Sequence, residues 1–501
     1  MTFLHLLDGA EVLLQSGNAE ISGVEYNSRR VRPGDCFVAM RGETTDGNRY
    51  IDAAMANGAV AVVTDSAQEK LRPGVAWAQV PHGRRALARI SANFYRRPAE
   101  KLRVTGITGT NGKTTTGFLV ESILRAAGRQ SMLVGTVEYH VAGKILPAPH
   151  TTPEALDLAR LFSEALGAGA TEAVMEVSSH ALEQQRVFGI PFDVAVFTNL
   201  TRDHLDYHQT MERYFDSKSI LFRGCGTEPP RVAVLNIEDE YGAKLAQSSK
   251  SELRLTYGIA TGDFHAERVD TGRNGTRFDL VMPEGAIPIW SPLVGQVNVY
   301  NILAAAAAAY GRECSAQAIE QGVAALTHVP GRFERVDCGQ GFYVVVDYAH
   351  TDDALRNLTT LARTLVKDRG RVITVFGCGG DRDRSKRPLM GEAAGQGSDF
   401  VVVTSDNPRS EDPLAIINDV LPGVQRSNVR YTMEPDRRKA IAQAIDEARP
   451  GDIVLIAGKG HEKVQITREG EAPFDDVGVA REVLRAVGYD PCASFSGEAA
   501  R

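Results

Sequence analysis

The segment LRVTGITGTNGKTTT, residues 102–116, organises the rest of this chain. Its apolar first half predicts a buried strand, a Gly- and Thr-rich turn follows, and an amphipathic helix begins at its end. Backbone N–H groups of such a turn point at anionic oxygens, so the segment predicts a polyphosphate-binding loop. Lys113 would neutralise phosphate charge, and the Thr114 hydroxyl could bind Mg²⁺. The strict P-loop pattern requires Gly at position 107, where this chain has Ile, with Gly106 one residue earlier. The alternative is an ordinary Gly-rich turn between a strand and a helix.

The composition predicts a soluble, cytoplasmic protein of several domains. A chain of 501 residues is too long for one core, and its 43% hydrophobic and 24% charged residues are ordinary for globular proteins. The net charge of −7 argues against a nucleic-acid partner. Six scattered Cys without a CxxC pair indicate reduced thiols. We expect no signal peptide and no membrane insertion, because the N-terminus lacks a basic region and the longest apolar run, 302–309, is short.

Apolar strand patterns predict three α/β units. In residues 1–100, short apolar segments at 36–40 and 59–63 alternate with helical patterns, and Arg-Arg-Pro at 96–98 marks a boundary. Residues 101–331 contain continuous apolar runs, which predict a parallel sheet covered on both faces. Residues 332–501 restart the βα pattern and predict a second doubly wound sheet without its own Gly-Lys-Thr loop.

Polar residues follow the strands of the middle unit, at the edge where ligands gather in parallel sheets. Glu176 ends a strand at the place where an acid would hold Mg²⁺ in a P-loop protein. His204 follows the next strand, and Lys218 lies on a predicted helix. Taken alone, His204 would be interpreted as a core histidine and Lys218 as a surface lysine. Together with Glu176 and the loop, they predict a metal–phosphate site.

Two other patterns allow two interpretations. Three Arg beside Ser28, in the segment 27–35, could grip a diphosphate or form a solvated basic loop. Asn298 and Asn301 begin an Ala-rich helix, where they could contact a base, although helix capping is the simpler prediction. The strands of the last unit also end in polar residues, namely Asp347, His350, Arg382, Asp383, Asp406, Asn407, Arg409, Lys459, His461 and Glu462.

The motifs of this chain resemble those of the Mur ligase family, in family order and over nearly the whole chain. They are GTNGKTT, EVSSH, NLTRDHLDYH, the Lys of DSKSILF, GxxNxxN, GRFE, DYAH, GCGGDRDRSKRPLM, DNPRSEDP and GKGHE. The resemblance is strongest to the members that add diaminopimelate. It implies an N-terminal UDP-binding domain (1–100), a central ATP-binding P-loop domain (101–331) and a C-terminal Rossmann-like, amino-acid-binding domain (332–501).

The resemblance also implies a reaction of cytoplasmic peptidoglycan precursor synthesis. ATP would phosphorylate the D-Glu carboxylate of UDP-N-acetylmuramoyl-L-alanyl-D-glutamate, and the amine of meso-2,6-diaminopimelate would attack the acyl phosphate. We expect a monomer that requires Mg²⁺ and CO₂, the latter to carbamylate Lys218. The expected catalytic residues are Lys113, Lys218 and His204.

Further roles are implied by the resemblance alone. Nucleotide binding is implied for Gly109, Thr110, Asn111, Gly112, Lys113, Thr114, Thr115, Asn298, Asn301, Arg332 and Asp347. Mg²⁺ binding is implied for Thr114, Glu176, His204 and Lys218. Contacts to the UDP-linked dipeptide are implied for Ser28, Thr151, Thr152, Ser178, Gln184 and Arg186, and contacts to diaminopimelate for Arg382, Asp406, Asn407, Pro408, Arg409, Gly458 and Glu462.

The chain departs from the family pattern at three places. Asn27 replaces a common Asp, residues 43–45 (Glu-Thr-Thr) replace the usual uridine-side loop, and Asp352 replaces a frequent Pro at a helix start. The first two differences affect the residues expected to bind uridine. The third is favourable, because a negative charge stabilises the N-terminus of a helix.

The predicted choice of amino acid rests on Asp406-Asn407-Pro408-Arg409, and chiefly on Arg409. A guanidinium can bind the second carboxylate of diaminopimelate through two hydrogen bonds, with Asp406 or Glu462 taking the ammonium. The alternative is that Arg409 pairs with Glu411 or Asp412 on the surface. Rival functions are a lysine-adding Mur ligase, a folylpolyglutamate-type ligase and a P-loop regulatory ATPase. The last has no need of an amino-acid pocket, so DNPR and GKGHE argue against it.

Overall fold

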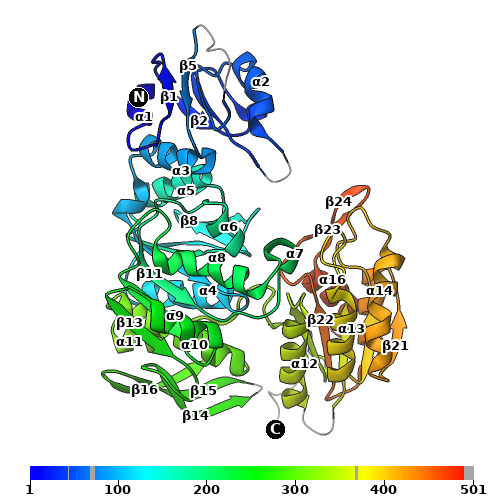
Figure 1. The fold of residues 1–501 in the computed structure, drawn as a ribbon. Coiled ribbons are helices and arrows are strands. Elements are labelled where there is room, and N and C mark those ends of the chain that lie inside the picture. Colours follow the sequence, from blue (N-terminus) through cyan, green and yellow to red (C-terminus); the bar gives the residue numbers. More distant parts are fainter. Residues whose placement is uncertain (43–44, 68–73, 273, 367–369, 490–501) are drawn as a thin grey trace.

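Three sheets with helices packed on them follow one another along the chain and form three units (Figure 1). The computed structural model describes residues 1–42, 45–67, 74–272, 274–366 and 370–489. Glu43, Thr44 and Cys492 lie outside these ranges. The first unit lies at one end of the central unit, and the last unit lies beside the central one (Figure 1).

The first unit contains a five-stranded sheet in which β1 alone runs antiparallel to its neighbour. Its strands, in sheet order, are β1 (Leu14–Ser16), β5 (Ala76–Gln79), β4 (Ala61–Thr64), β3 (Asp35–Ala39) and β2 (Gly23–Glu25), and its helices are α1 (Phe3–Leu6), α2 (Ile51–Ala56) and α3 (Gly83–Phe94). Ser28 begins the short helix η1 (Ser28–Arg30), which Asn27 caps by accepting a hydrogen bond from the Arg29 N–H at 3.1 Å. The Asn at position 27 therefore preserves the turn, because Asp would accept the same bond.

The central unit contains the predicted parallel sheet, extended at one edge by an antiparallel hairpin. In sheet order its strands are β13 (Leu253–Tyr257), β12 (Val232–Asn236), β11 (Phe192–Phe197), β6 (Arg103–Thr108), β10 (Glu172–Glu176), β7 (Ser131–Val134), β8 (Glu138–Val141) and β9 (Lys144–Pro147). The first six are parallel, and their carboxyl ends share one edge, as the continuous apolar runs predicted.

Helices cover both faces of the central sheet. One apolar core joins the sheet to α4 (Lys113–Ala126), α10 (Gln296–Gly311) and α11 (Ala316–Ala325). The other joins it to α5 (Ala155–Gly167), α6 (Ser179–Glu183), α8 (Met211–Arg223) and α9 (Glu240–Ser248). The short helix α7 (Leu205–His208) lies on the side that faces the last unit (Figure 1). A separate antiparallel sheet, which the sequence analysis did not predict, contains β14 (His265–Gly272), β15 (Gly275–Met282) and β16 (Gly285–Ser291).

The last unit is the second doubly wound sheet. Its strands, in sheet order, are β17 (Glu334–Arg335), β18 (Tyr343–Asp347), β22 (Ile453–Ala457), β19 (Val372–Phe376), β20 (Phe400–Val403) and β21 (Arg430–Met433), and only β17 is antiparallel to its neighbour. One face packs α12 (Asp352–Val366), α13 (Lys386–Gly397) and α14 (Pro413–Arg426), and the other packs α15 (Arg437–Glu447) and α16 (Asp476–Ala486). The hairpin of β23 (Val464–Thr467) and β24 (Gly470–Pro473) lies over this unit.

The structure also bears on the expected capping of α10 and on the state of the cysteines. Helix α10 begins after Gly295 with no side-chain cap, and the Asn298 amide donates to the Val294 carbonyl at 2.8 Å, so the capping prediction is wrong. The five described cysteines are free and buried, as expected for reduced thiols. Within the described ranges, we find no helix with the length and apolarity that a membrane span requires. The domain division at residues 100 and 331 stays a prediction.

Candidate active site

The loop between β6 and α4 has the geometry of an anion cradle. Gly109 and Gly112 have φ angles of 147° and 86°, which favour glycine, and a Cβ on Gly109 would lie 1.9 Å from the Thr198 hydroxyl. Lys113 folds back over the loop and donates to the carbonyls of Gly109 (2.9 Å) and Thr110 (2.8 Å). Burial lowers the pKa of Lys113, because enclosure disfavours the charged ammonium group, and phosphate oxygens bound in the loop would stabilise that charge.

A cavity of about 400 Å³ opens beside this loop, between the central and last units. Eight of the residues proposed for nucleotide binding line it, namely Asn111, Gly112, Thr114, Thr115, Asn298, Asn301, Arg332 and Asp347. Gly109, Thr110 and Lys113 belong to the loop but are not among the lining residues. Leu358 and Leu361 of α12 add an apolar wall that no sequence motif indicated.

Arg332 and Asn111 join the two units at this cavity. The Arg332 guanidinium donates to the Thr114 hydroxyl at 3.2 Å. Asp347 accepts from the Phe333 N–H at 2.7 Å, and burial raises the pKa of its carboxyl group. Asn111 reaches across to Asp353 of α12 at 3.1 Å. The last unit therefore completes the pocket that begins at the loop.

Lys218 approaches the same loop from α8. Its side chain is 1% exposed, its Nζ donates to the Gly109 carbonyl at 2.8 Å, and it lies 4.5 Å from the centre of the Tyr214 ring. Burial, and next the charge of Lys113, lower the pKa of Lys218 well below its ordinary value. A buried lysine beside a second lysine is therefore stabilised as a neutral amine.

The other residues proposed to bind Mg²⁺ lie at the carboxyl edge of the central sheet. Glu176, at the end of β10, accepts from the N–H (2.8 Å) and hydroxyl (2.9 Å) of Thr136. His204 has a left-handed φ of 53° and lies 3.3 Å from a carboxylate oxygen of Asp203, and its ring centre is 5.0 Å from that of His180. In the part of the chain that the structure describes, no group of three or more His, Cys, Asp or Glu side chains could hold a metal ion.

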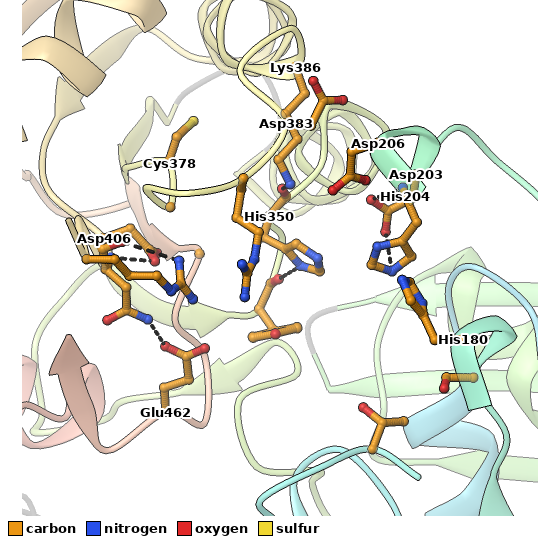
Figure 2. A pocket seen from close by; sticks show the side chains of 18 of the residues that line it. His180, Asp203, His204, Asp206, His350, Cys378, Asp383, Lys386, Asp406 and Glu462 are labelled. Carbon is orange, nitrogen blue, oxygen red and sulfur yellow. Dashed lines mark hydrogen bonds and ion pairs between the residues drawn. The ribbon is translucent and has the colours of Figure 1, made fainter. Parts of the chain in front are cut away.

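A second cavity, of about 590 Å³, has walls from the central and last units. The central wall includes five residues proposed for the dipeptide: Thr151, Thr152, Ser178, Gln184 and Arg186. The facing wall includes six proposed for diaminopimelate: Arg382, Asp406, Asn407, Arg409, Gly458 and Glu462. Figure 2 shows Asp406 and Glu462 on one side, His180 and His204 on the other, and His350 between them. Ser28 and Pro408 are not among the lining residues.

The central wall is held by a contact with the first unit that the sequence analysis missed. Arg186 donates to the Thr152 carbonyl at 3.0 Å and lies 3.2 Å from a carboxylate oxygen of Glu154. Glu154 in turn accepts two hydrogen bonds, at 2.7 and 2.8 Å, from Arg84 of α3. Only the tertiary fold brings Arg84 to this wall, so no local pattern could have indicated it.

Hydrogen bonds also hold the wall that the last unit contributes to the large cavity. The fully buried Lys459 donates to Asn407 and to Glu462, both at 3.0 Å, and the Asn407 amide donates to Glu462 at 2.7 Å. Arg409 donates to the Gly380 carbonyl at 2.8 Å, and burial, followed by the charge of Arg382, lowers its pKa.

The surface-pair alternative for Arg409 is wrong. Glu411 accepts hydrogen bonds from Arg387 instead, and Asp412 caps α14 by accepting from the Leu414 N–H. Arg409 instead donates to the Gly380 carbonyl and is among the residues that line the large cavity.

Comparison with known proteins gives consistent matches along the chain. Residues 20–95 match a family profile described as "Mur ligase family, catalytic domain", residues 107–309 match "Mur ligase middle domain", and residues 331–460 match "Mur ligase, glutamate ligase domain". A curated protein of Solibacter usitatus, named UDP-N-acetylmuramoyl-L-alanyl-D-glutamate--2,6-diaminopimelate ligase, is 55% identical, covering 94% of each chain. A protein of the same name from Geobacter metallireducens is 48% identical, covering 91% of this chain and 93% of its own.

Solved structures agree with these matches. A structure of a protein with the same ligase name is 36% identical, with a TM-score of 0.65, and the match covers 93% of this chain and 95% of that one. The structure of MurF ligase from Thermotoga maritima in complex with ADP has a TM-score of 0.64 at 20% identity, covering 92% and 97%. At that identity the second match shows the shared fold alone.

Proposed function

The chain belongs to the Mur ligase family, and on that premise we propose that it joins meso-2,6-diaminopimelate to UDP-N-acetylmuramoyl-L-alanyl-D-glutamate at the expense of ATP. The observation that carries this proposal is the 590 Å³ cavity, because it presents the residues proposed for the two substrates on facing walls. The cavity beside the loop supports ATP as the third substrate.

The proposed reaction needs activation, because a carboxylate is a poor electrophile in water. ATP transfers its γ-phosphoryl group to the D-Glu carboxylate, and the amine of diaminopimelate then attacks the acyl carbon and releases phosphate. The protein binds and orients the reacting groups and stabilises charge. In this scheme Lys113 moves from the carbonyls of Gly109 and Thr110 to the phosphate oxygens.

The Thr114 hydroxyl and the Glu176 carboxylate are oxygen donors, which Mg²⁺ prefers, and the phosphate oxygens of bound ATP would supply further ligands. Thr114 and Glu176 would hold one ion, and His204 and Lys218 would hold a second. When bound, the metal neutralises charge on the phosphate oxygens. An ammonium at Lys218 would repel it, so we propose that the neutral amine adds to CO₂, loses a proton and becomes a carbamate. The buried, like-charged surroundings of Lys218 support this modification.

Recognition of diaminopimelate would use the fixed wall of the last unit. Arg409 would bind the second carboxylate through two hydrogen bonds, and Asp406 or Glu462 would take the neighbouring ammonium. We propose a monomer, because one chain supplies both walls of the cavity. Its similarity to the diaminopimelate-adding ligases supports work in the cytoplasm.

Phosphate release tests this proposal against a regulatory ATPase. We expect release only when ATP, the UDP-linked dipeptide and diaminopimelate are all present, with one peptide bond formed per phosphate. Full release with ATP alone, and no ligated product by mass spectrometry, would contradict the proposed function.

A further inference from the structure

Two loops of the last unit each carry one arginine of the large cavity, and these two loops are in contact. One follows β19 and carries Arg382, and the other follows β20 and carries Arg409. The Gly380 N–H donates to the Asn407 carbonyl at 2.9 Å, and Arg409 donates back to the Gly380 carbonyl at 2.8 Å. A Cβ on Gly380 would lie 1.9 Å from the Pro408 carbonyl oxygen, so only glycine permits this approach.

Side chains fasten the same two loops on their outer side. Asp381 accepts from the Ser410 hydroxyl at 2.6 Å and from its N–H at 3.2 Å. The Asp381 N–H donates to Glu411 at 2.6 Å. Asp381 and Arg409 have left-handed φ angles of 53° and 52°, which residues with a Cβ keep only where surrounding contacts hold them.

We call these contacts between the two loops, made by Asp381, Ser410 and Glu411, the clamp. A buried arginine lies beneath it. Arg387 of α13 is fully buried and donates to both carboxylate oxygens of Glu411, at 2.8 and 2.9 Å. It also donates to Asp419 at 2.9 Å and to the Gly379 carbonyl at 3.3 Å. The hydrogen bonds from Arg387 lower the pKa of Glu411 to about 2, so the pair is ionised at neutral pH.

We propose that Arg387, Glu411 and Asp381 are positioning residues that hold Arg382 and Arg409 at the spacing needed to read the carboxylates of diaminopimelate. None of the three is among the residues that line the cavity, so they act through the two arginines. A long guanidinium side chain binds a planar anion well only when its orientation is fixed in advance. This inference rests on the proposed function, since it assigns the selectivity of that site to the clamp.

Two substitutions and one matched control test the clamp. Glu411→Gln removes the charge that faces Arg387, and Asp381→Asn weakens the exposed tie to Ser410. Asp412→Asn removes a charge one residue away while preserving the cap of α14, because Asn also caps helices. We expect the first two to raise the KM for diaminopimelate at least about tenfold, since a displaced binding group costs that much or more. The KM for ATP should stay unchanged, the preference over lysine should fall, and the control should match wild type.

A clamp with a purely structural role gives a different result. Unchanged KM values for diaminopimelate in folded variants, or equal losses for ATP and diaminopimelate, would overturn the inference. If Glu411→Gln does not fold, Asp381→Asn decides, because the Asp381 side chain lies at the surface. The wild-type enzyme separates the two proposals: failure to use diaminopimelate refutes the proposed function, whereas normal use with unaffected variants refutes only the clamp.

Discussion

At the scale of single residues, Lys218 is the clearest case of a side chain whose surroundings disfavour its ordinary charge. It is enclosed, it lies beside Lys113, and it touches the phosphate loop at Gly109. We expect Lys218→Ala to lose nearly all ligation and to recover part of it with added acetate, which can replace a carbamate. Lys244→Ala is the matched control, because Lys244 is an exposed lysine paired with Glu240. Wild-type activity of Lys218→Ala would exclude a catalytic role for this lysine.

Glu447 permits a prediction about pH. Its carboxylate accepts hydrogen bonds from Arg430 (2.7 Å) and Arg371 (2.8 Å), which lower its pKa from 4.5 to about 2. The stabilisation is therefore complete above the ordinary value of 4.5 and is lost as the pH falls through about 2. We expect Glu447→Gln to unfold at lower urea concentration at neutral pH and to lose less stability than wild type on acidification. If the free energy of unfolding falls equally with pH in the wild type and in Glu447→Gln, the ion pairs of Glu447 do not stabilise the protein.

At the scale of secondary-structure elements, a buried ion pair fastens α15 and α16 to the last sheet. Arg437 and Asp476 are both fully enclosed and form hydrogen bonds of 2.6 and 2.8 Å. Arg437 also donates to the carbonyls of Ser405 and Ala457, each of which precedes a residue of the large cavity. We expect Asp476→Asn to destabilise the protein by about 3–5 kcal/mol, because it leaves a buried charge without its partner.

The neighbouring residue Arg438 provides the control for that prediction. Its pair with Glu482 is about half exposed on both sides. Breaking it with Arg438→Ala should change the free energy of unfolding by only about 0–1 kcal/mol. Equal effects of Asp476→Asn and Arg438→Ala in urea unfolding would show that burial does not set the strength of the first pair.

The elements that the sequence predicted well are those with strong local patterns. The strands that end at Glu176 and Asp347 contain continuous apolar runs at 173–175 and 343–346, and such runs are typical of strands buried on both faces of a parallel sheet. The β14–β16 sheet and the hairpin β23–β24 were missed, because most residues of β14, β16, β23 and β24 are exposed or only partly buried. The contact of Arg84 with Glu154 joins residues 70 positions apart, so it depends on the packing of two units.

At the scale of the whole molecule, the walls of the proposed site belong to different units of the chain. The loop at Lys113 is central, and the residues proposed for the amine substrate lie in the last unit. Since reacting atoms must come within about 3 Å of one another, we expect the last unit to close on the central one when substrates bind. Small-angle scattering should show a smaller radius of gyration with an ATP analogue and the UDP-linked dipeptide. If the free protein is open and its radius of gyration does not change when both ligands are saturating, the last unit does not close.

We propose that this Mur ligase selects diaminopimelate through Arg409. The most direct measurement compares kcat/KM for meso-diaminopimelate and L-lysine in the wild type and in Arg409→Ala. We expect the wild type to prefer diaminopimelate by up to the order of 10⁴-fold, because lysine leaves the guanidinium desolvated and without a partner. The variant should lose most of this preference. Efficient use of lysine by the wild type, or a preference that survives in Arg409→Ala, would contradict the account.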